Sequence, residues 1–131
     1  MILFLPGDKL MHNVLRSLKN ACIGLKYCFK TQRNMAIHAL VGIVVVAAGI
    51  ILRVSLSGML FLLTAIASVL VAEAFNTALE KTIDLYTVKR NHIAQTAKDV
   101  AAGAVLLTSV YAVITGFIIL GPPLWQLIWR F

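Results

Sequence analysis

Three long stretches with almost no charge constrain the fold of this chain more than any other feature. Residues 37–52 are apolar apart from His38, no charged residue lies between Arg53 and Glu73, and residues 100–120 are uncharged. A helix needs about 20 apolar residues to cross the hydrocarbon core of a bilayer. Since 60% of the 131 residues are hydrophobic, we predict an all-α integral membrane protein with three transmembrane helices in a single domain, residues 1–131.

The three spans are expected at residues 34–53, 54–79 and 99–120. A cytoplasmic connection over residues 80–98 separates the second from the third, and residues 121–131 form a tail. Gly121, Pro122 and Pro123 are expected to stop the third helix, because proline lacks the N–H that continues a helix. Small residues let helices approach closely in lipid, so we expect one face of the third helix to pack on another helix. That face carries Ala101, Ala104, Thr108, Ala112 and Thr115.

Residues 12–30 predict an amphipathic helix before the first span. Its apolar stripe is Leu15, Leu18, Cys22, Leu25 and Phe29, and its basic stripe is Arg16, Lys19, Lys26 and Lys30. Adjacent apolar and basic stripes are typical of a helix in the bilayer interface, with its bases toward lipid phosphates. The alternative is an amphipathic helix docked on protein.

The basic residues predict the orientation in the membrane. Six Lys or Arg residues precede the first span, Arg53 alone separates the first two spans, and four lie between residues 79 and 99. The positive-inside rule therefore places the N-terminus in the cytoplasm and the C-terminus outside. The same rule explains the net charge of +7, so we expect no nucleic-acid partner. No cleavable signal is expected, and Cys22 and Cys28 are read as reduced thiols.

A polar stripe is predicted on the second span. Glu73, Asn76, Glu80 and Asp84 follow one another at spacings of three, four and four. On a helix they fall within about 80° of one another. A charged side chain at the centre of a membrane helix costs about 2.5–3.5 kcal/mol, so the carboxylate at the deep end indicates a function.

The stripe fits phosphoryl transfer at the membrane surface. Glu73 can accept a proton from a lipid hydroxyl, Glu80 can hold Mg²⁺, and Lys98 can neutralise the transferring phosphate. The sequence lacks the phosphate-binding loop and the catalytic motifs of soluble kinases. Two other classes stay open from the residues alone: a small proton or cation transporter that uses Glu73, and a purely structural membrane subunit. We read His38 as an interfacial hydrogen-bonding residue rather than a metal ligand.

Two motifs carry a family resemblance, E-A-F-N-T-A-L-E-K-T-I-D-L at residues 73–85 and A-K-D-V-A-A-G-A-V-L-L at residues 97–107. From about residue 13 to residue 120 the sequence resembles the prokaryotic diacylglycerol kinase family, which includes undecaprenol kinases of Gram-positive bacteria. The resemblance implies a multi-pass lipid kinase of the bacterial inner membrane. Such kinases have an interfacial helix and three spans, and they form homotrimers whose ATP–Mg²⁺ sites are shared between subunits.

The resemblance also assigns roles to individual residues. Glu73 matches the general base that acts on the lipid hydroxyl, Asn76 matches an asparagine near the reacting phosphate, and Glu80 matches a metal ligand. Lys98 and Asp99 match a Lys-Asp pair in the nucleotide site, with Lys98 on the phosphates.

Asp84 matches a recurrent aspartate at the helix end, with a structural or a direct role. It can also simply pair with Lys81 or Lys98.

The chain departs from the family pattern at three places. Gln32 stands where the family has a second metal-binding glutamate, which predicts weaker Mg²⁺ binding or one ion fewer. Met35-Ala36 replaces an aromatic and a basic residue. Lys89-Arg90-Asn91 replaces a loop that often reads E-Y-H, so adenine contacts are not carried over. Gln32 also leaves a further alternative open, a family member that binds lipid or ATP without turnover.

The pattern R-N-x-x-I-H at residues 33–38 and A-A-G-A-V-L-L at residues 101–107 favours undecaprenol as the acceptor lipid. Diacylglycerol is the alternative, because both lipids present a primary hydroxyl at the interface.

Overall fold

Four helices make up the computed structural model, which describes residues 6–86 and 91–129. They are α1 (Pro6–Thr31), α2 (Arg33–Ile51), α3 (Leu56–Tyr86) and α4 (His92–Ile128). The helices α2, α3 and α4 are each long and apolar enough to cross a membrane. The predicted all-α architecture with three candidate spans is therefore confirmed.

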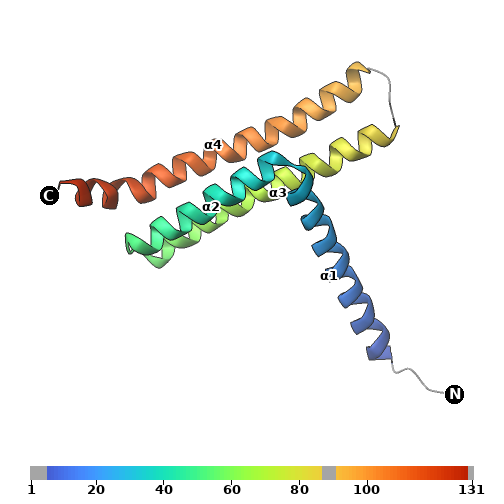
Figure 1. The fold of residues 1–131 in the computed structure, drawn as a ribbon, viewed down its shortest axis with the longest axis horizontal. Helices are drawn as coiled ribbons and strands as arrows, with labels where there is room; N and C mark the ends of the chain where they lie inside the picture. The colour runs from blue at the N-terminus through green and yellow to red at the C-terminus, as the bar shows by residue number, and fades with distance from the viewer. Residues whose placement is uncertain (1–5, 87–90, 130–131) are drawn as a thin grey trace.

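The three long helices lie side by side, and α3 contacts both α2 and α4 (Figure 1). The buried apolar side chains come mainly from α3, where Leu62, Ala65 and Val69 follow one another at helical spacing. Met35 near the start of α2 is also buried. Because the other faces of the three helices expose large apolar side chains, they are suited to contact with lipid.

A tight connection joins α2 to α3. Arg53 takes a left-handed backbone conformation with φ of 54°, and the Ser55 hydroxyl accepts a hydrogen bond of 3.2 Å from the Gly58 N–H. This bond satisfies one of the free N–H groups at the start of α3. Closer to the middle of α2, a Cβ added at Gly42 would lie 2.8 Å from Cγ2 of Ile66. Glycine at this position therefore lets α2 approach α3 closely.

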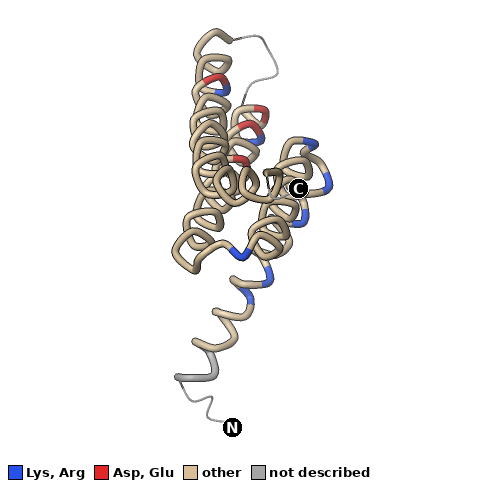
Figure 2. The backbone as a smooth tube through the Cα atoms, turned by 90° about the vertical axis from the view of Figure 1, so that its left-hand side faces the viewer, with Lys and Arg blue, Asp and Glu red and all other residues tan. Residues whose placement is uncertain are grey.

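The first helix projects away from the other three (Figure 1). Its apolar stripe is uncovered along most of its length, and Leu15 and Leu18 are each 59% exposed. Figure 2 shows basic residues spaced along α1 and acidic residues gathered on α3 and α4. Within the described chain the apolar stripe is thus not docked on protein, and contact with a membrane interface stays a prediction.

One predicted helix end is wrong. The sequence expectation was that Gly121, Pro122 and Pro123 stop the third span, but α4 continues through both prolines to Ile128. Each proline lacks an N–H and so removes one hydrogen bond to the carbonyl four residues earlier. Membrane helices tolerate this loss when neighbouring groups bind the free carbonyl. The rings of Trp125 and Trp129 then contact one another in the last turns, with centroids 5.4 Å apart.

The expected connection over residues 80–98 is largely helical. The helix α3 continues to Tyr86 and α4 begins at His92, after Asn91 accepts hydrogen bonds from the N–H groups of Ile93 and Ala94. Most of this segment thus consists of the polar ends of α3 and α4. Its cytoplasmic placement stays a prediction, and Lys89 and Arg90 lie outside the described residues.

Candidate functional site

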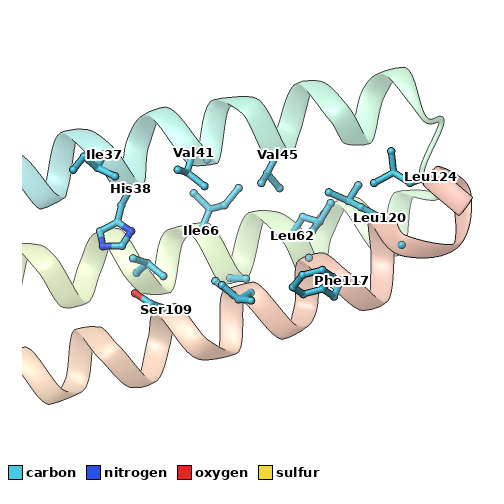
Figure 3. Close-up of a pocket in the computed structure, with 17 residues that line it drawn as sticks. Ile37, His38, Val41, Val45, Leu62, Ile66, Ser109, Phe117, Leu120 and Leu124 are labelled. Atoms are coloured by element: carbon cyan, nitrogen blue, oxygen red, sulfur yellow. The ribbon is translucent and has the colours of Figure 1, made fainter. Parts of the chain in front are cut away.

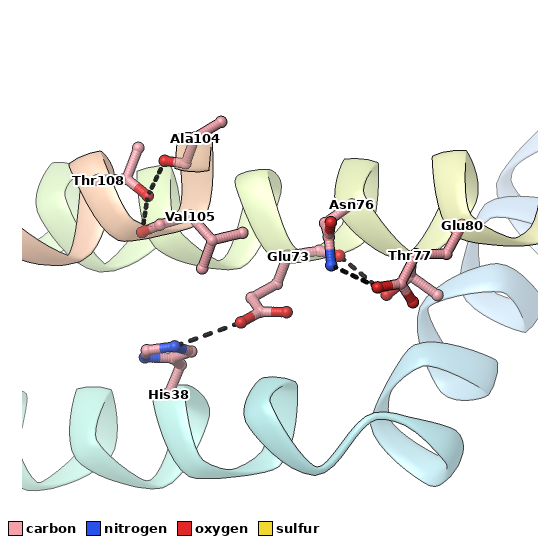
Figure 4. A network of polar contacts seen from close by, with 8 residues as sticks. All are labelled: His38, Glu73, Asn76, Thr77, Glu80, Ala104, Val105 and Thr108. Carbon is pink, nitrogen blue, oxygen red and sulfur yellow. Dashed lines mark hydrogen bonds and ion pairs between the residues drawn. The ribbon is translucent and has the colours of Figure 1, made fainter. Parts of the chain in front are cut away.

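The polar stripe of α3 becomes steadily more exposed toward the end of the helix. Glu73 is 3% exposed, Asn76 and Glu80 are half-buried, and Asp84 is exposed. Figure 4 shows Glu73, Asn76 and Glu80 along α3, with the start of α2 and part of α1 nearby. The stripe thus runs from an interior carboxylate to the surface of the bundle.

Glu73 faces the neighbouring helix α2. Its Oε1 lies 3.3 Å from Nε2 of His38, but this contact is not aligned as a hydrogen bond, so Oε1 has no hydrogen-bond partner among the described residues. The backbone carbonyl of Glu73 accepts a bond of 2.9 Å from the Thr77 hydroxyl. A buried acceptor without a donor costs about 1–3 kcal/mol, so the Glu73 carboxylate is suited to receive a donor from a ligand.

Asn76 links the deep and the shallow parts of the stripe. Its Nδ2 donates a hydrogen bond of 3.3 Å to Oε1 of Glu80, while its Oδ1 is buried and has no partner among the described residues. Two acceptor oxygens one turn apart, on Glu73 and Asn76, are therefore available for a ligand.

A second cluster joins the ends of α3 and α4. Lys98 donates a hydrogen bond of 2.6 Å to Oδ1 of Asp84, and Asp99 accepts one of 2.8 Å from Gln95. Pairing of Asp84 with Lys98, one of the two partners considered for it, is thus confirmed. Lys98 is held on the same side of the bundle as the shallow end of the stripe, where it can also meet a phosphate.

Gln32 lies at the bend between α1 and α2. It is the residue before α2, with φ of −108° and ψ of 110°, and its side chain makes no capping hydrogen bond. Cys28 and Met35 on either side of the bend are buried, and both α1 and α2 contact α3. The packing of the bend on α3 leaves the Gln32 amide half-buried and free of a capping role.

The oxygen atoms of this region fit Mg²⁺ held together with a nucleotide. Within residues 6–86 and 91–129, no three His, Cys, Asp or Glu side chains lie close enough to form a metal centre of their own. Magnesium usually keeps several waters and binds through one or two carboxylates and substrate phosphates. Glu80, with the unpartnered Asn76 Oδ1 one turn away, suits that mode of binding.

An apolar pocket of about 620 Å³ lies between α2, α3 and α4 (Figure 3). Its lining is apolar along most of its length, from Ile37 at one end to Leu124 at the other. Among the described residues that line the pocket, only His38 and Ser109, both at the Ile37 end, have polar side chains. An aliphatic chain fits such a pocket, and its polar group would lie toward His38 and Glu73.

The sequence reasoning did not connect His38 with Glu73. The signal was present, because His38 is the one polar residue in the apolar run over residues 37–52. Its partner lies on another helix, however, and the relative register of α2 and α3 is not visible in the spacing of residues.

The comparisons with known proteins agree on one family. The model of the prokaryotic diacylglycerol kinase family matches residues 19–120. A protein of Synechocystis named diacylglycerol kinase is 41% identical over 116 residues, which are 88% of this chain and 66% of that protein. A Bacillus subtilis protein named undecaprenol kinase is 32% identical over 114 residues, which are 87% of this chain and 93% of that protein. The chain thus spans just under two thirds of the first relative and nearly all of the second.

Proposed function

This chain belongs to the prokaryotic diacylglycerol kinase family, and we propose that it is an ATP- and Mg²⁺-dependent kinase that phosphorylates the primary hydroxyl of a membrane lipid. The observation that carries the proposal is the buried carboxylate of Glu73, which contacts His38 at the polar end of an apolar pocket. A lipid chain in that pocket brings its hydroxyl to the carboxylate.

The proposed reaction transfers the γ-phosphoryl group of ATP to the lipid hydroxyl. Glu73 accepts the proton of the lipid hydroxyl as the hydroxyl oxygen attacks the γ-phosphorus of ATP. The bond from that phosphorus to the bridging oxygen breaks, and ADP leaves. Because the transferring phosphoryl group carries spread negative charge, a nearby cation stabilises it. Lys98 supplies such a charge from α4, and Asp84 on α3 holds Lys98 through the hydrogen bond between them.

Glu80 would hold the metal ion, which neutralises the phosphates of the nucleotide when bound, and Asn76 would lie near the reacting phosphate. Gln32 would add a neutral amide oxygen. An amide ligates Mg²⁺ more weakly than the glutamate of the family does, since it brings no charge.

Undecaprenol is the acceptor that we propose first. The R-N-x-x-I-H and A-A-G-A-V-L-L patterns support it, and the relative named undecaprenol kinase matches along almost its whole length. Diacylglycerol is the second candidate, because the relative named diacylglycerol kinase has the higher identity.

Transfer of labelled γ-phosphate from ATP to each lipid, in matched mixed micelles with Mg²⁺, tests the proposal. We expect labelled undecaprenyl phosphate in excess over phosphatidic acid. The reverse preference would make the protein a diacylglycerol kinase, and transfer to neither lipid would contradict the proposal that it is a kinase.

We further propose that the protein lies in the bacterial cytoplasmic membrane with its N-terminus inside and its C-terminus outside, as the basic residues of α1 favour. A membrane-impermeant thiol reagent should label a cysteine at position 19 (Lys19→Cys), in a variant without other cysteines, only in inside-out vesicles. Labelling in intact cells would contradict this orientation.

A further inference from the structure

His38 on α2 contacts the carboxylate of Glu73 on α3. Its Nε2 is 3.3 Å from Oε1 of Glu73, and the two side chains are 29% and 4% exposed. The short contact without hydrogen-bond alignment leaves Oε1 unpartnered within the described residues. Hydrogen bonds in active sites are often long or poorly aligned before substrate binds and tighten in the complex.

The surroundings of His38 offer the imidazole ring little else to bind. It lies at one end of the apolar pocket, where Ser109 on α4 is the one other polar side chain among the described lining residues (Figure 3). Figure 4 shows the ring directed from α2 toward Glu73 on α3. The ring thus stands between the apolar pocket and the polar stripe, in contact with both.

We propose that His38 is a positioning residue for Glu73. His38 donates a hydrogen bond from its Nε2 to Oε1 of Glu73, and so leaves Oε2 of Glu73 directed at the lipid hydroxyl. The inference rests on the proposed role of Glu73 as the general base. A carboxylate held at one oxygen loses the rotation about its last torsion, and the accuracy of such positioning has a large effect on rate. Both the neutral Nε2–H form and the imidazolium form of histidine can make this donation.

The proposal predicts a specific kinetic result for two substitutions. His38→Leu keeps much of the side-chain volume but removes the donor, so kcat should fall by up to about 100-fold, the cost of misplacing a reacting group by about 1 Å. The KM for ATP should stay within about twofold, because His38 lies at the lipid side of the site. His38→Gln restores an N–H donor and should recover most of the lost kcat.

His12→Leu is the matched control, since it makes the same substitution at an exposed histidine of α1 that does not line the pocket. It should leave kcat unchanged. The inference is wrong if His38→Leu keeps the wild-type kcat, or if His38→Gln is as impaired as His38→Leu.

A second measurement tests the pair without any assay of activity. The chain has three histidines, so the ring ¹⁵N resonances of His12, His38 and His92 can be assigned with single variants. Glu73→Gln should shift the His38 ring resonances and leave the other two in place. An unchanged His38 signal would overturn the inference. Wild-type protein that transfers no phosphate would instead defeat the proposed function, while the ring shifts would still report the contact.

Discussion

Gln32 is one of the places where this chain departs from the pattern that the family resemblance leads us to expect. A carboxylate is expected at this position from the resemblance, and the chain carries a neutral amide instead. The side chain is half-buried at the bend between α1 and α2 and is not used to cap α2. It is therefore available as a ligand, but a weak one.

The substitution Gln32→Glu should strengthen Mg²⁺ binding, because it adds a negative charge to a site that uses oxygen ligands. We expect the Mg²⁺ concentration for half-maximal phosphate transfer to fall by about tenfold, which corresponds to about 1.4 kcal/mol. The measurement is a Mg²⁺ titration at saturating ATP. Gln126→Glu places the same charge near the end of α4 and should change nothing. An unaltered titration for Gln32→Glu would remove this position from the metal site.

At the scale of residues, sequence periodicity predicted the polar stripe of α3, because a helix fixes which positions share a face. The contact of Asp84 with Lys98 was one of two pairs considered. The contact of His38 with Glu73 was not predicted, since it depends on how far α2 slides along α3. That register is set by close packing at positions such as Gly42, which spacing alone does not reveal.

At the scale of elements, the approach of α2 to α3 holds His38 against Glu73. A Cβ at position 42 would lie 2.8 Å from Cγ2 of Ile66, and this atom branches from Cβ, so it cannot swing aside easily. A larger residue at position 42 therefore has to move the helices apart.

We predict that Gly42→Ala destabilises the folded protein by about 1–3 kcal/mol, the usual cost of overpacking. It should also lower phosphate transfer, since the helices move apart near His38. Thermal unfolding in detergent measures the first effect. Gly103→Ala is the matched control, because a Cβ there meets nothing within 4 Å and alanine favours a helix. Equal stability of the two variants would contradict the close approach.

The helix boundaries show where sequence rules failed. Proline is a strong stop signal in soluble helices, but α4 passes through Pro122 and Pro123. The rule holds where water can bind the carbonyls that lose their N–H partner. In a membrane no water is available, so a helix that continues leaves fewer backbone groups without a hydrogen bond. In the same way, the charged residues between positions 80 and 98 suggested a connection, although most of that segment is the solvent-facing end of two helices.

At the scale of the whole molecule, one chain exposes much of its site. Asn76 and Glu80 are only half-buried and Asp99 is exposed, which suits a site completed by a neighbouring subunit. From this exposure and the family resemblance we propose a homotrimer with shared sites.

A mixing experiment tests the shared site. Glu73→Gln and Lys98→Met should each be inactive alone. If the Glu73 and Lys98 of one working site come from different chains, trimers reassembled from both variants should regain activity. Reassembly of Glu73→Gln with itself is the control. Mixed trimers that stay inactive would show that one chain supplies both residues.

The most direct test of the account is the effect of Glu73→Gln on phosphate transfer to the preferred lipid. The amide keeps the size of the side chain but cannot accept the hydroxyl proton, so kcat should fall about 10²- to 10⁴-fold. The variant should keep its helical circular dichroism in detergent, and Ser68→Ala on the same helix should stay fully active. A folded Glu73→Gln protein that keeps most of its transfer activity would contradict the assignment of Glu73 as the base.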